Sequence, residues 1–161
     1  MTSRGEKSGP ISELARKAQE ITQNMLNHSA INGKALVVED SATRILIEIV
    51  TAEAGLVIGS QGETLNAMQT LVRAITSVDN EKRIPIMLDC QGYRGRREAA
   101  LINQAHELAA QVRESGKEAV IEGLSPYERR IVHLALADDP TIVTYSEGEG
   151  EDRRLVVSPA D

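Results

Sequence analysis

The chain has 161 residues, of which 41% are hydrophobic and 26% are charged, and its formal net charge is −6. This length allows one ordinary globular domain or two very small ones. The longest apolar runs are far too short to span a membrane and the start has no signal-peptide pattern, so we expect a cytoplasmic protein. Cys90 is the only cysteine, which excludes an intrachain disulfide and a cysteine-based zinc site. We expect it to be a buried thiol.

The negative charge is distributed unevenly along the chain. Net acidity argues at first sight against nucleic acid, whose binding proteins usually have a basic surface. However, residues 138–161 contain seven acidic and two basic residues, whereas residues 91–137 contain six acidic and seven basic ones. A local cationic patch is therefore compatible with the overall charge. Three tyrosines are the whole aromatic content, so we do not expect base stacking on an aromatic platform.

Residues 1–11 have the composition of a flexible leader, and the segment after them has the pattern of a helix over 12–28. Ser12 is a good N-cap, and apolar residues recur behind it at helical spacing: Leu14, Ala18, Ile21 and Met25. Two short β-branched runs follow, at 34–40 and 43–50, separated by a polar turn. They predict a hairpin, with Ile45, Ile47 and Ile49 on one face.

The hairpin is followed by a short helical stretch at 52–58, a glycine pair and a longer helix. Four apolar residues form the stripe of that longer helix: Leu65, Met68, Val72 and Ile75. A strand over 83–89 completes the unit, and Pro85 favours an edge position for it because proline has no backbone N–H. The predicted order is helix, strand, strand, helix, helix, strand.

A second unit is predicted from residue 91 onward, beginning with a long helix that ends at Gly116. Its stripe consists of Leu101, Ala105, Leu108 and Val112. Extended backwards, this stripe places Arg94 and Arg97 on the inward side of the helix start. Residues 119–124 read as a strand. The segments 141–146 and 153–158 predict a hairpin with an acidic, flexible tip.

The helix between these strands has a complete set of start signals. Ser125 is its N-cap, Pro126 takes the first helical position, and Glu128 stands three residues after the cap. This combination is a capping box, in which each end of the motif satisfies a backbone N–H of the other. We therefore expect a helix that begins at Pro126.

The first motif with functional meaning is Gly59-Ser60-Gln61-Gly62, between two helices. Two glycines tolerate unusual backbone angles and let a ligand backbone approach, while the amides and the following helix N-terminus favour phosphate oxygens. The alternative is a helix C-cap followed by an ordinary turn. The residues that a P-loop or a dinucleotide-binding fold requires are absent. The context of two amphipathic helices and three strands resembles a KH domain of the type II order, which clamps about four nucleotides of single-stranded nucleic acid.

The second motif is Arg129 and His133, four residues apart on one face of the helix that follows Ser125. An arginine can hold a phosphate with two hydrogen bonds, and a histidine beside it can donate another. The alternative is a surface arginine with a structural histidine. A capped helix with Arg-x-x-x-His, followed by two short strands, resembles the R-3-H domain, a single-stranded nucleic-acid-binding module.

A KH unit followed by an R-3-H unit resembles the Jag family of bacterial RNA-binding proteins, also called KhpB or SpoIIIJ-associated. The resemblance covers residues 12 to about 158 and includes the segment 88–101 at the junction. It implies an α+β fold, with a KH domain at 12–90 and an R-3-H domain at 91–161. Many members carry an additional N-terminal Jag domain, and we expect this chain to lack it. The loop residues between the glycines are often basic in the family but neutral here.

These observations predict a non-enzymatic single-stranded RNA-binding protein, with no cofactor and no metal. It would act as a post-transcriptional regulator or RNA chaperone, and the resemblance implies links to cell division, elongation or sporulation. The expected RNA contacts are Ile58, Gly59, Ser60, Gln61, Gly62, Leu65, Arg94, Arg97, Arg129, Arg130 and His133. Arg94, Arg96 and Arg97 also have a simpler interpretation as a solvated or salt-bridged cluster. Single-stranded DNA is an alternative ligand.

Two other functions are weighed against RNA binding. The first is a protein-interaction adaptor, in which the KH unit self-associates or joins a small KH-domain protein; the family resemblance also implies a link to the membrane insertase. The second is a hydrolase that uses His133 with Glu128. These two side chains diverge on a helix, which makes shared catalysis geometrically poor. The three histidines are far apart in sequence and show no metal-ligand spacing.

Overall fold

The structure, a computed structural model, describes residues 11–160, except for the side chain of Glu151. The chain divides into two compact units, the first ending at Arg94 and the second beginning at Gly95. The predicted domain boundary between residues 90 and 91 lies just before this division and stays a prediction. Apart from Ile11, the predicted leader lies outside the described residues.

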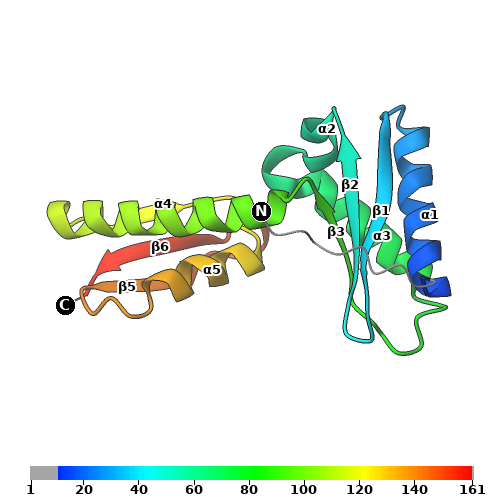
Figure 1. Ribbon diagram of the computed structural model, residues 1–161. Coiled ribbons are helices and arrows are strands. Elements are labelled where there is room, and N and C mark those ends of the chain that lie inside the picture. The colour runs from blue at the N-terminus through cyan, green and yellow to red at the C-terminus, as the bar shows by residue number, and fades with distance from the viewer. Residues whose placement is uncertain (1–10, 161) are drawn as a thin grey trace, which may run out of the picture. The chain divides into compact units, whose positions relative to one another are not determined.

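The first unit has the predicted order of elements (Figure 1). They are α1 (Glu13–His28), β1 (Gly33–Asp40), β2 (Ile45–Thr51), α2 (Ala54–Ile58), the 3-10 turn η1 (Ser60–Gly62), α3 (Glu63–Thr76) and β3 (Ile86–Cys90). The central strand β2 pairs antiparallel with β1 and parallel with β3. The predicted edge position of the last strand is confirmed, and Pro85 lies just before it.

The core of this unit lies between its helices and one face of its sheet. Ile45, Ile47 and Ile49 of β2 are fully buried, as their alternation predicts. Cys90 is buried too, as expected of this thiol. The face of α1 that enters the core is rotated by one residue from the predicted stripe: its buried residues are Ala15, Ala18, Thr22 and Leu26, whereas Leu14, Ile21 and Met25 are half-buried against the same core.

The predicted stripe of α3 is wrong at its end. Leu65 and Val72 are fully buried, but Ile75 is 48% exposed and Thr76 is buried in its place. Position 76 lies one turn after Val72 on the core side, and the Thr76 hydroxyl donates a hydrogen bond of 2.7 Å to the Val72 carbonyl. Because this bond satisfies the buried hydroxyl, Thr76 can enter the core in place of its neighbour Ile75, which the pattern placed there.

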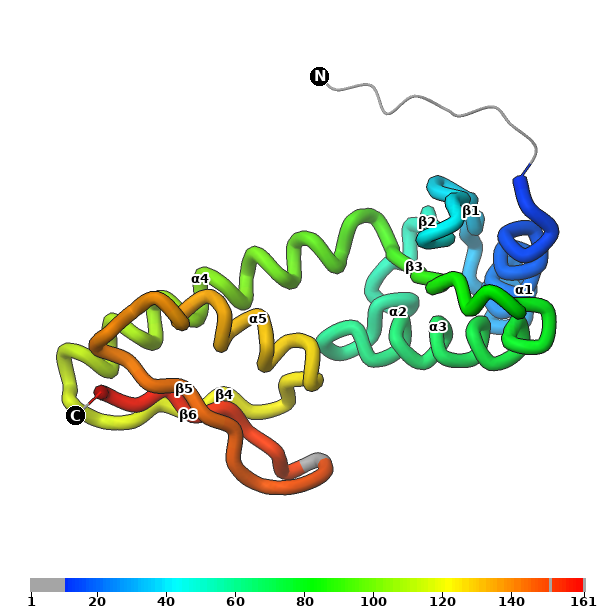
Figure 2. Tube along the Cα trace, turned by 90° about the horizontal axis from the view of Figure 1, so that it is seen from below, coloured from blue at the N-terminus to red at the C-terminus, as the bar shows by residue number. Residues whose placement is uncertain are grey.

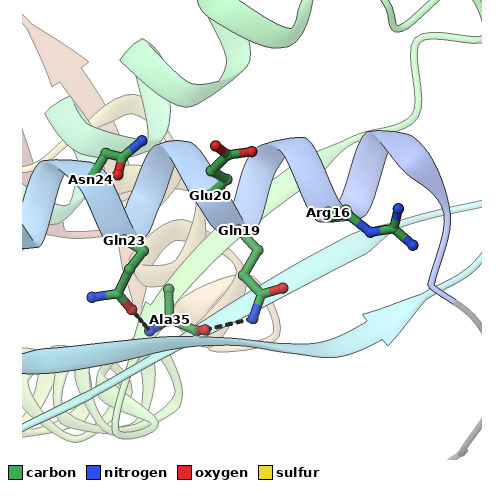
Figure 3. Close-up of a pocket in the computed structure, with 6 residues that line it drawn as sticks. All are labelled: Arg16, Gln19, Glu20, Gln23, Asn24 and Ala35. Atoms are coloured by element: carbon green, nitrogen blue, oxygen red, sulfur yellow. Dashed lines mark hydrogen bonds between the residues drawn. The ribbon is translucent and has the colours of Figure 1, made fainter.

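Glutamine and arginine side chains bind the outer backbone of both edge strands. At β1, Gln19 Nε2 donates to the Ala35 carbonyl at 2.8 Å and Gln23 Oε1 accepts from the Ala35 N–H at 3.0 Å, beside a shallow pocket on α1 (Figure 3). At β3, Gln69 Oε1 accepts from the Leu88 N–H at 3.0 Å. Unpaired strand edges invite pairing with other chains, and these side-chain bonds oppose it.

The second unit comprises α4 (Tyr93–Ser115), whose first two residues belong to the first unit, β4 (Ala119–Ile121), α5 (Pro126–Leu136), β5 (Ile142–Glu147), the 3-10 turn η2 (Gly150–Asp152) and β6 (Arg154–Pro159). Strand β6 lies between β4 and β5 and is antiparallel to both. Both helices lie on the same face of this sheet (Figure 2). The predicted α+β class is therefore confirmed for both units.

The capping box at the start of α5 is confirmed. The Ser125 hydroxyl accepts a hydrogen bond from the Glu128 N–H at 3.2 Å, and the Glu128 carboxylate accepts one from the Ser125 N–H at 2.8 Å. The end of α4 is confirmed as well, since Gly116 has a φ of +65° and its N–H donates to the Val112 carbonyl. In the part of the chain that the structure describes, no helix is both long and apolar enough to cross a membrane.

Candidate nucleic-acid interface

The loop between α2 and α3 needs glycine at both ends. Gly59 has a φ of +71° and Gly62 a φ of +87°. A β-carbon at Gly59 would lie 2.8 Å from Thr64 Cβ, and one at Gly62 would lie 2.8 Å from Tyr93 Cε1. At both positions the backbone φ is positive, and a β-carbon would overlap a neighbouring side chain. Both features favour glycine.

This geometry corrects the reason for which the glycines were expected. Their missing β-carbons face side chains of the protein itself rather than an approaching ligand. Gly62 is buried, whereas Ser60 and Gln61 between the glycines are exposed. Gln61 also has a positive φ, +50°. The glycines therefore shape the loop, and the surface that it offers to a ligand is the pair Ser60 and Gln61.

The loop leads directly into the N-terminus of α3, a helix of 14 residues. Its N-cap, Gly62, has no side chain to satisfy the first N–H groups, and the Glu63 N–H donates to the Ser60 carbonyl. A helix N-terminus attracts anions through its unpaired N–H groups and the helix dipole. The exposed carboxylate of Glu63 opposes this attraction. The loop contains no cationic side chain, so it can hold a phosphate only through backbone N–H groups and a complementary shape.

Two apolar residues were expected to line a groove for bases beside this loop. Ile58 is half-buried and packs against the core of the first unit. Leu65 is fully buried, so the expectation that it contacts a base is wrong. It lies on the core face of α3, with Val72 two turns further on, and a core residue has no surface to offer. Of these two expected residues, only Ile58 keeps exposed apolar surface beside the loop.

Arg94, expected to contact phosphate, is engaged within the first unit. Its Nε donates to the Leu88 carbonyl at 2.8 Å, and its Nη2 donates to the side-chain oxygens of Asn66 at 3.0 Å and Gln69 at 3.2 Å. The side chain thus joins the start of α4 to α3 and β3. A phosphate contact by Arg94 stays a prediction, and it would cost these hydrogen bonds.

Arg97 is engaged in the second unit, where its Nε donates to Glu128 at 2.8 Å. This ion pair joins α4 to α5, and Glu128 is 9% exposed. Burial raises the pKa of Glu128, but the hydrogen bonds from the Ser125 backbone N–H and from Arg97 outweigh it, so that the pKa lies below its ordinary value. Arg97 is one of the salt-bridged arginines that the sequence left as an alternative, and its contact with RNA stays a prediction.

Arg129 and His133 lie one turn apart on α5, and neighbouring elements hold both. Arg129 Nη1 donates to the Leu124 carbonyl at 2.6 Å, and His133 Nδ1 shares a hydrogen bond of 2.5 Å with the Thr144 hydroxyl on β5. His133 is exposed and Arg129 is half-exposed. Held side chains lose less conformational entropy when they bind a ligand. Neither the other ring nitrogen of His133 nor the other terminal nitrogen of Arg129 has a partner among the described residues.

An exposed aromatic residue beside this pair was not predicted from the sequence. Tyr127 is 66% exposed at the start of α5, and Arg130, also exposed, follows it by three residues on the same side of the helix. Rings of this kind stack on unpaired bases. The small number of aromatic residues concealed this feature, because composition does not show how exposed each of the three tyrosines is.

The described residues contain no group of three or more potential metal ligands close together. Glu128 and His133, the pair considered for hydrolysis, differ in environment. The Glu128 carboxylate is bonded to Ser125 and Arg97 and its pKa is lowered, whereas His133 is exposed and bonded to Thr144. A general base with a lowered pKa is a weak one at neutral pH.

Taken together, the two units define a protein with a type II KH fold followed by an R-3-H fold, each carrying a candidate surface for single-stranded nucleic acid. Family models agree with this class: "KhpA/KhpB, KH domain" matches residues 15–87 and the R-3-H domain model matches residues 99–159. The chain is 34% identical to the RNA-binding protein KhpB of Bacillus subtilis over 156 residues, which are 95% of this chain and 72% of that protein. It belongs to the KhpB family, as the resemblance predicted.

Other KhpB proteins match over a smaller share of their length. The RNA-binding protein KhpB of Clostridium symbiosum is 36% identical over 106 residues, which are 66% of this chain and 48% of that protein. That of Streptococcus pneumoniae serotype 2 is 26% identical over 148 residues, which are 91% of this chain and 44% of that protein. The chain thus spans about half the length of these two relatives.

Proposed function

We propose that the chain binds single-stranded RNA through both units and acts, without catalysis, as a post-transcriptional regulator or RNA chaperone. The observation that carries this proposal is the loop from Gly59 to Gly62, which turns Ser60 and Gln61 outward at an uncapped helix N-terminus. Relatives that bear the name RNA-binding protein support it. A cytoplasmic location belongs to the same proposal.

The two units would contribute differently to binding. The first would hold the sugar-phosphate backbone at its loop, with little charge of its own. The second would supply Arg129, Arg130 and His133 for a further phosphate and Tyr127 for a base. Two weak sites on one chain raise the overall affinity because binding at one increases the effective concentration of RNA at the other.

The experiment replaces Ser60 and Gln61 together by Asp, which places two carboxylates at the proposed phosphate contact. The matched control replaces both by Asn, which has nearly the same size and no charge. Both residues tolerate the positive φ of Gln61. Affinity for an unstructured RNA oligonucleotide, measured by fluorescence anisotropy, should fall at least about tenfold for the Asp variant. This corresponds to a loss of about 1.4 kcal/mol in binding free energy. Equal affinity of the folded Asp and Asn variants would contradict the proposed role of the loop.

A protein-interaction adaptor is the second candidate, favoured by one observation. The outer side of α3 and the turn after it expose three large apolar residues: Leu71 (54%), Ile75 (48%) and Val78 (83%). Exposed apolar residues that cluster in this way are typical of a surface that contacts another protein. Association with a small KH-domain protein or with the insertase would be of this kind. A complex that survives ribonuclease treatment and is lost on Leu71→Glu would support it, and one that ribonuclease abolishes would contradict it.

A further inference from the structure

The first unit has a cationic pocket away from the glycine loop. It is a pocket of about 460 Å³ where the chain returns from α3 to β3. Its lining contains two arginines, Arg73 and Arg83, and no carboxylate; the remaining lining residues are Ser77, Asn80 and the segment 84–86. Neither arginine was predicted from the sequence to be a site residue.

The fold holds the Arg73 side chain in place. Its Nε donates a hydrogen bond of 2.6 Å to the carbonyl of Ile86, the first residue of β3. This bond fixes the plane of the guanidinium group and leaves its two terminal nitrogens without a partner in the described part of the chain. A guanidinium group held through Nε can still donate two parallel hydrogen bonds to one ligand.

Arg83 is presented by a braced turn. Its φ is +50°, which a residue other than glycine adopts at a cost, and its N–H donates to the Asn80 carbonyl at 2.9 Å. The Asn80 side chain bonds both backbone groups of Ile84, each at 2.8 Å. Asn80 therefore maintains a strained turn whose tip residue is an exposed arginine. Within residues 11–160, the Arg83 guanidinium has no ion-pair partner.

The chemistry of the pocket selects an anion. The Ser77 hydroxyl donates to the Ala74 carbonyl at 2.7 Å and the Asn80 amide is used on Ile84, so the two arginines are its main source of hydrogen-bond donors. Asp79, close by in sequence, is paired with Lys17. Two guanidinium groups without a carboxylate favour a ligand that carries several negative oxygens, such as a phosphate group.

A polar face of α3 connects this pocket to the glycine loop. Gly62, Asn66, Gln69 and Arg73 are spaced by four, three and four residues and so share one side of the helix. The path from Gly62 to Arg73 is about 16 Å at the rise of an α-helix. The Arg94 side chain is bonded to Asn66 and Gln69 on this face, so a nucleic-acid strand held at the loop would pass over Arg94 to reach the pocket.

We propose that the Arg73–Arg83 pocket binds a backbone phosphate of the RNA strand that the Gly59–Gly62 loop holds. The inference rests on the proposed function, since the same strand occupies both sites. It gives the first unit the cations that its loop lacks. Pro85, exposed at the edge of the pocket, offers an apolar surface to the adjoining ribose.

The test compares Arg83→Asn with Lys82→Asn in the full chain. Both variants remove one positive charge from the same loop, but Lys82 does not line the pocket, and asparagine tolerates the positive φ at position 83. For an unstructured RNA oligonucleotide, Arg83→Asn should lower the affinity about fivefold and reduce the slope of log K against log salt by about 0.7. Lys82→Asn should change both quantities by less than half as much.

Equal effects of the two variants, or no effect of either, would contradict phosphate binding at the pocket. Neither result would contradict RNA binding by the protein. A parent protein that binds no RNA would contradict the proposed function and the pocket with it. A third arm separates RNA from free phosphate: the NMR signals of the Arg73 and Arg83 Nε–H groups should shift with RNA and not with inorganic phosphate at the same concentration. A shift with inorganic phosphate alone would show a free-anion site and overturn the proposal.

Discussion

Gly59 and Gly62 have backbone angles that other residues adopt at a cost. At each position a neighbouring side chain occupies the space that a β-carbon would need. Thr64 lies against the first and Tyr93 against the second. The fold therefore requires both glycines independently of any ligand. At the scale of single residues, the same requirement turns Ser60 and Gln61 outward, so that the demands of folding create the surface proposed to bind RNA.

Replacing Gly62 by Ala should destabilise the protein. The new β-carbon would lie 2.8 Å from Tyr93 Cε1 at a φ of +87°, so strain and overlap should lower the free energy of unfolding by about 1–3 kcal/mol. Urea unfolding followed by circular dichroism measures this. Gly55→Ala is the matched control, because Gly55 lies in α2 with nothing within 4 Å of the added carbon. It should leave stability unchanged or raise it by up to about 1 kcal/mol. Equal stability of the two variants would contradict this account of the loop.

Tyr127 should contribute to RNA binding through its ring. Tyr127→Ala should weaken binding by about 1–3 kcal/mol, the contribution that an aromatic side chain makes by stacking on one base. Tyr127→Phe retains the ring and should bind nearly as well as the parent. Titration of a single-stranded RNA, monitored by fluorescence anisotropy, separates the two outcomes. If Ala and Phe bind alike, the ring does not stack on a base.

At the scale of elements, the Arg97–Glu128 ion pair connects the start of α4 to the start of α5. The same carboxylate completes the capping box with Ser125. One side chain thus sets both the first turn of α5 and its contact with α4. Because α5 carries Arg129, His133 and Tyr127, this connection supports the candidate surface of the second unit.

Glu128→Gln should destabilise the second unit in a pH-dependent way. Because the pKa of Glu128 is lowered in the folded protein, its ionised form stabilises the fold above the unfolded pKa of about 4.3. That contribution is lost as the pH falls through the folded pKa. The parent should therefore be more stable than the variant at neutral pH, by about 1.5–3 kcal/mol, the contribution of hydrogen bonds to a charged group. Denaturant unfolding over a pH series should show this difference shrinking below about pH 4; a difference that does not vary with pH would contradict it.

Patterns within one element were sufficient to predict the helices, the strands and the capping box. Ser125, Pro126 and Glu128 form the start of the helix among themselves, so this start could be predicted without knowledge of distant contacts. What the sequence could not predict depends on distant contacts. Tyr93 fills the space beside Gly62, thirty-one positions earlier in the chain, and no local pattern shows this. Similarly, a leucine at position 65 could line a groove or enter the core, and only the packing of the folded chain distinguishes these two positions.

At the scale of the whole molecule, a chain with a net charge of −6 is proposed to bind a polyanion. The structure offers local cations instead of an overall positive charge: Arg129 and Arg130 in the second unit, and Arg73 and Arg83 in the first. Arg94 and Arg97 already form hydrogen bonds within the protein, and a phosphate could bind them only at the cost of those bonds. Binding should therefore depend on a few direct contacts and be modest in strength.

The salt dependence of RNA binding should reflect these few contacts. With about two to four phosphates held by each unit, the slope of log K against log salt should lie between about −3 and −6 for the full chain. Anisotropy titrations over a series of potassium chloride concentrations measure the slope. A slope near zero would show that phosphates are not contacted, and one steeper than about −8 would require a basic surface that the described residues do not show.

Photocrosslinking of RNA to the purified full chain, followed by mapping of the crosslinked peptides, tests the central claim most directly. The account predicts crosslinks around Ser60, Gln61 and Asn66 in the first unit and around Tyr127, Arg130 and His133 in the second. It predicts none on the exposed face of β1, around Leu36 and Val38, which carries no proposed contact. Crosslinks in neither predicted region, or crosslinks concentrated on β1, would contradict RNA binding by the two proposed surfaces.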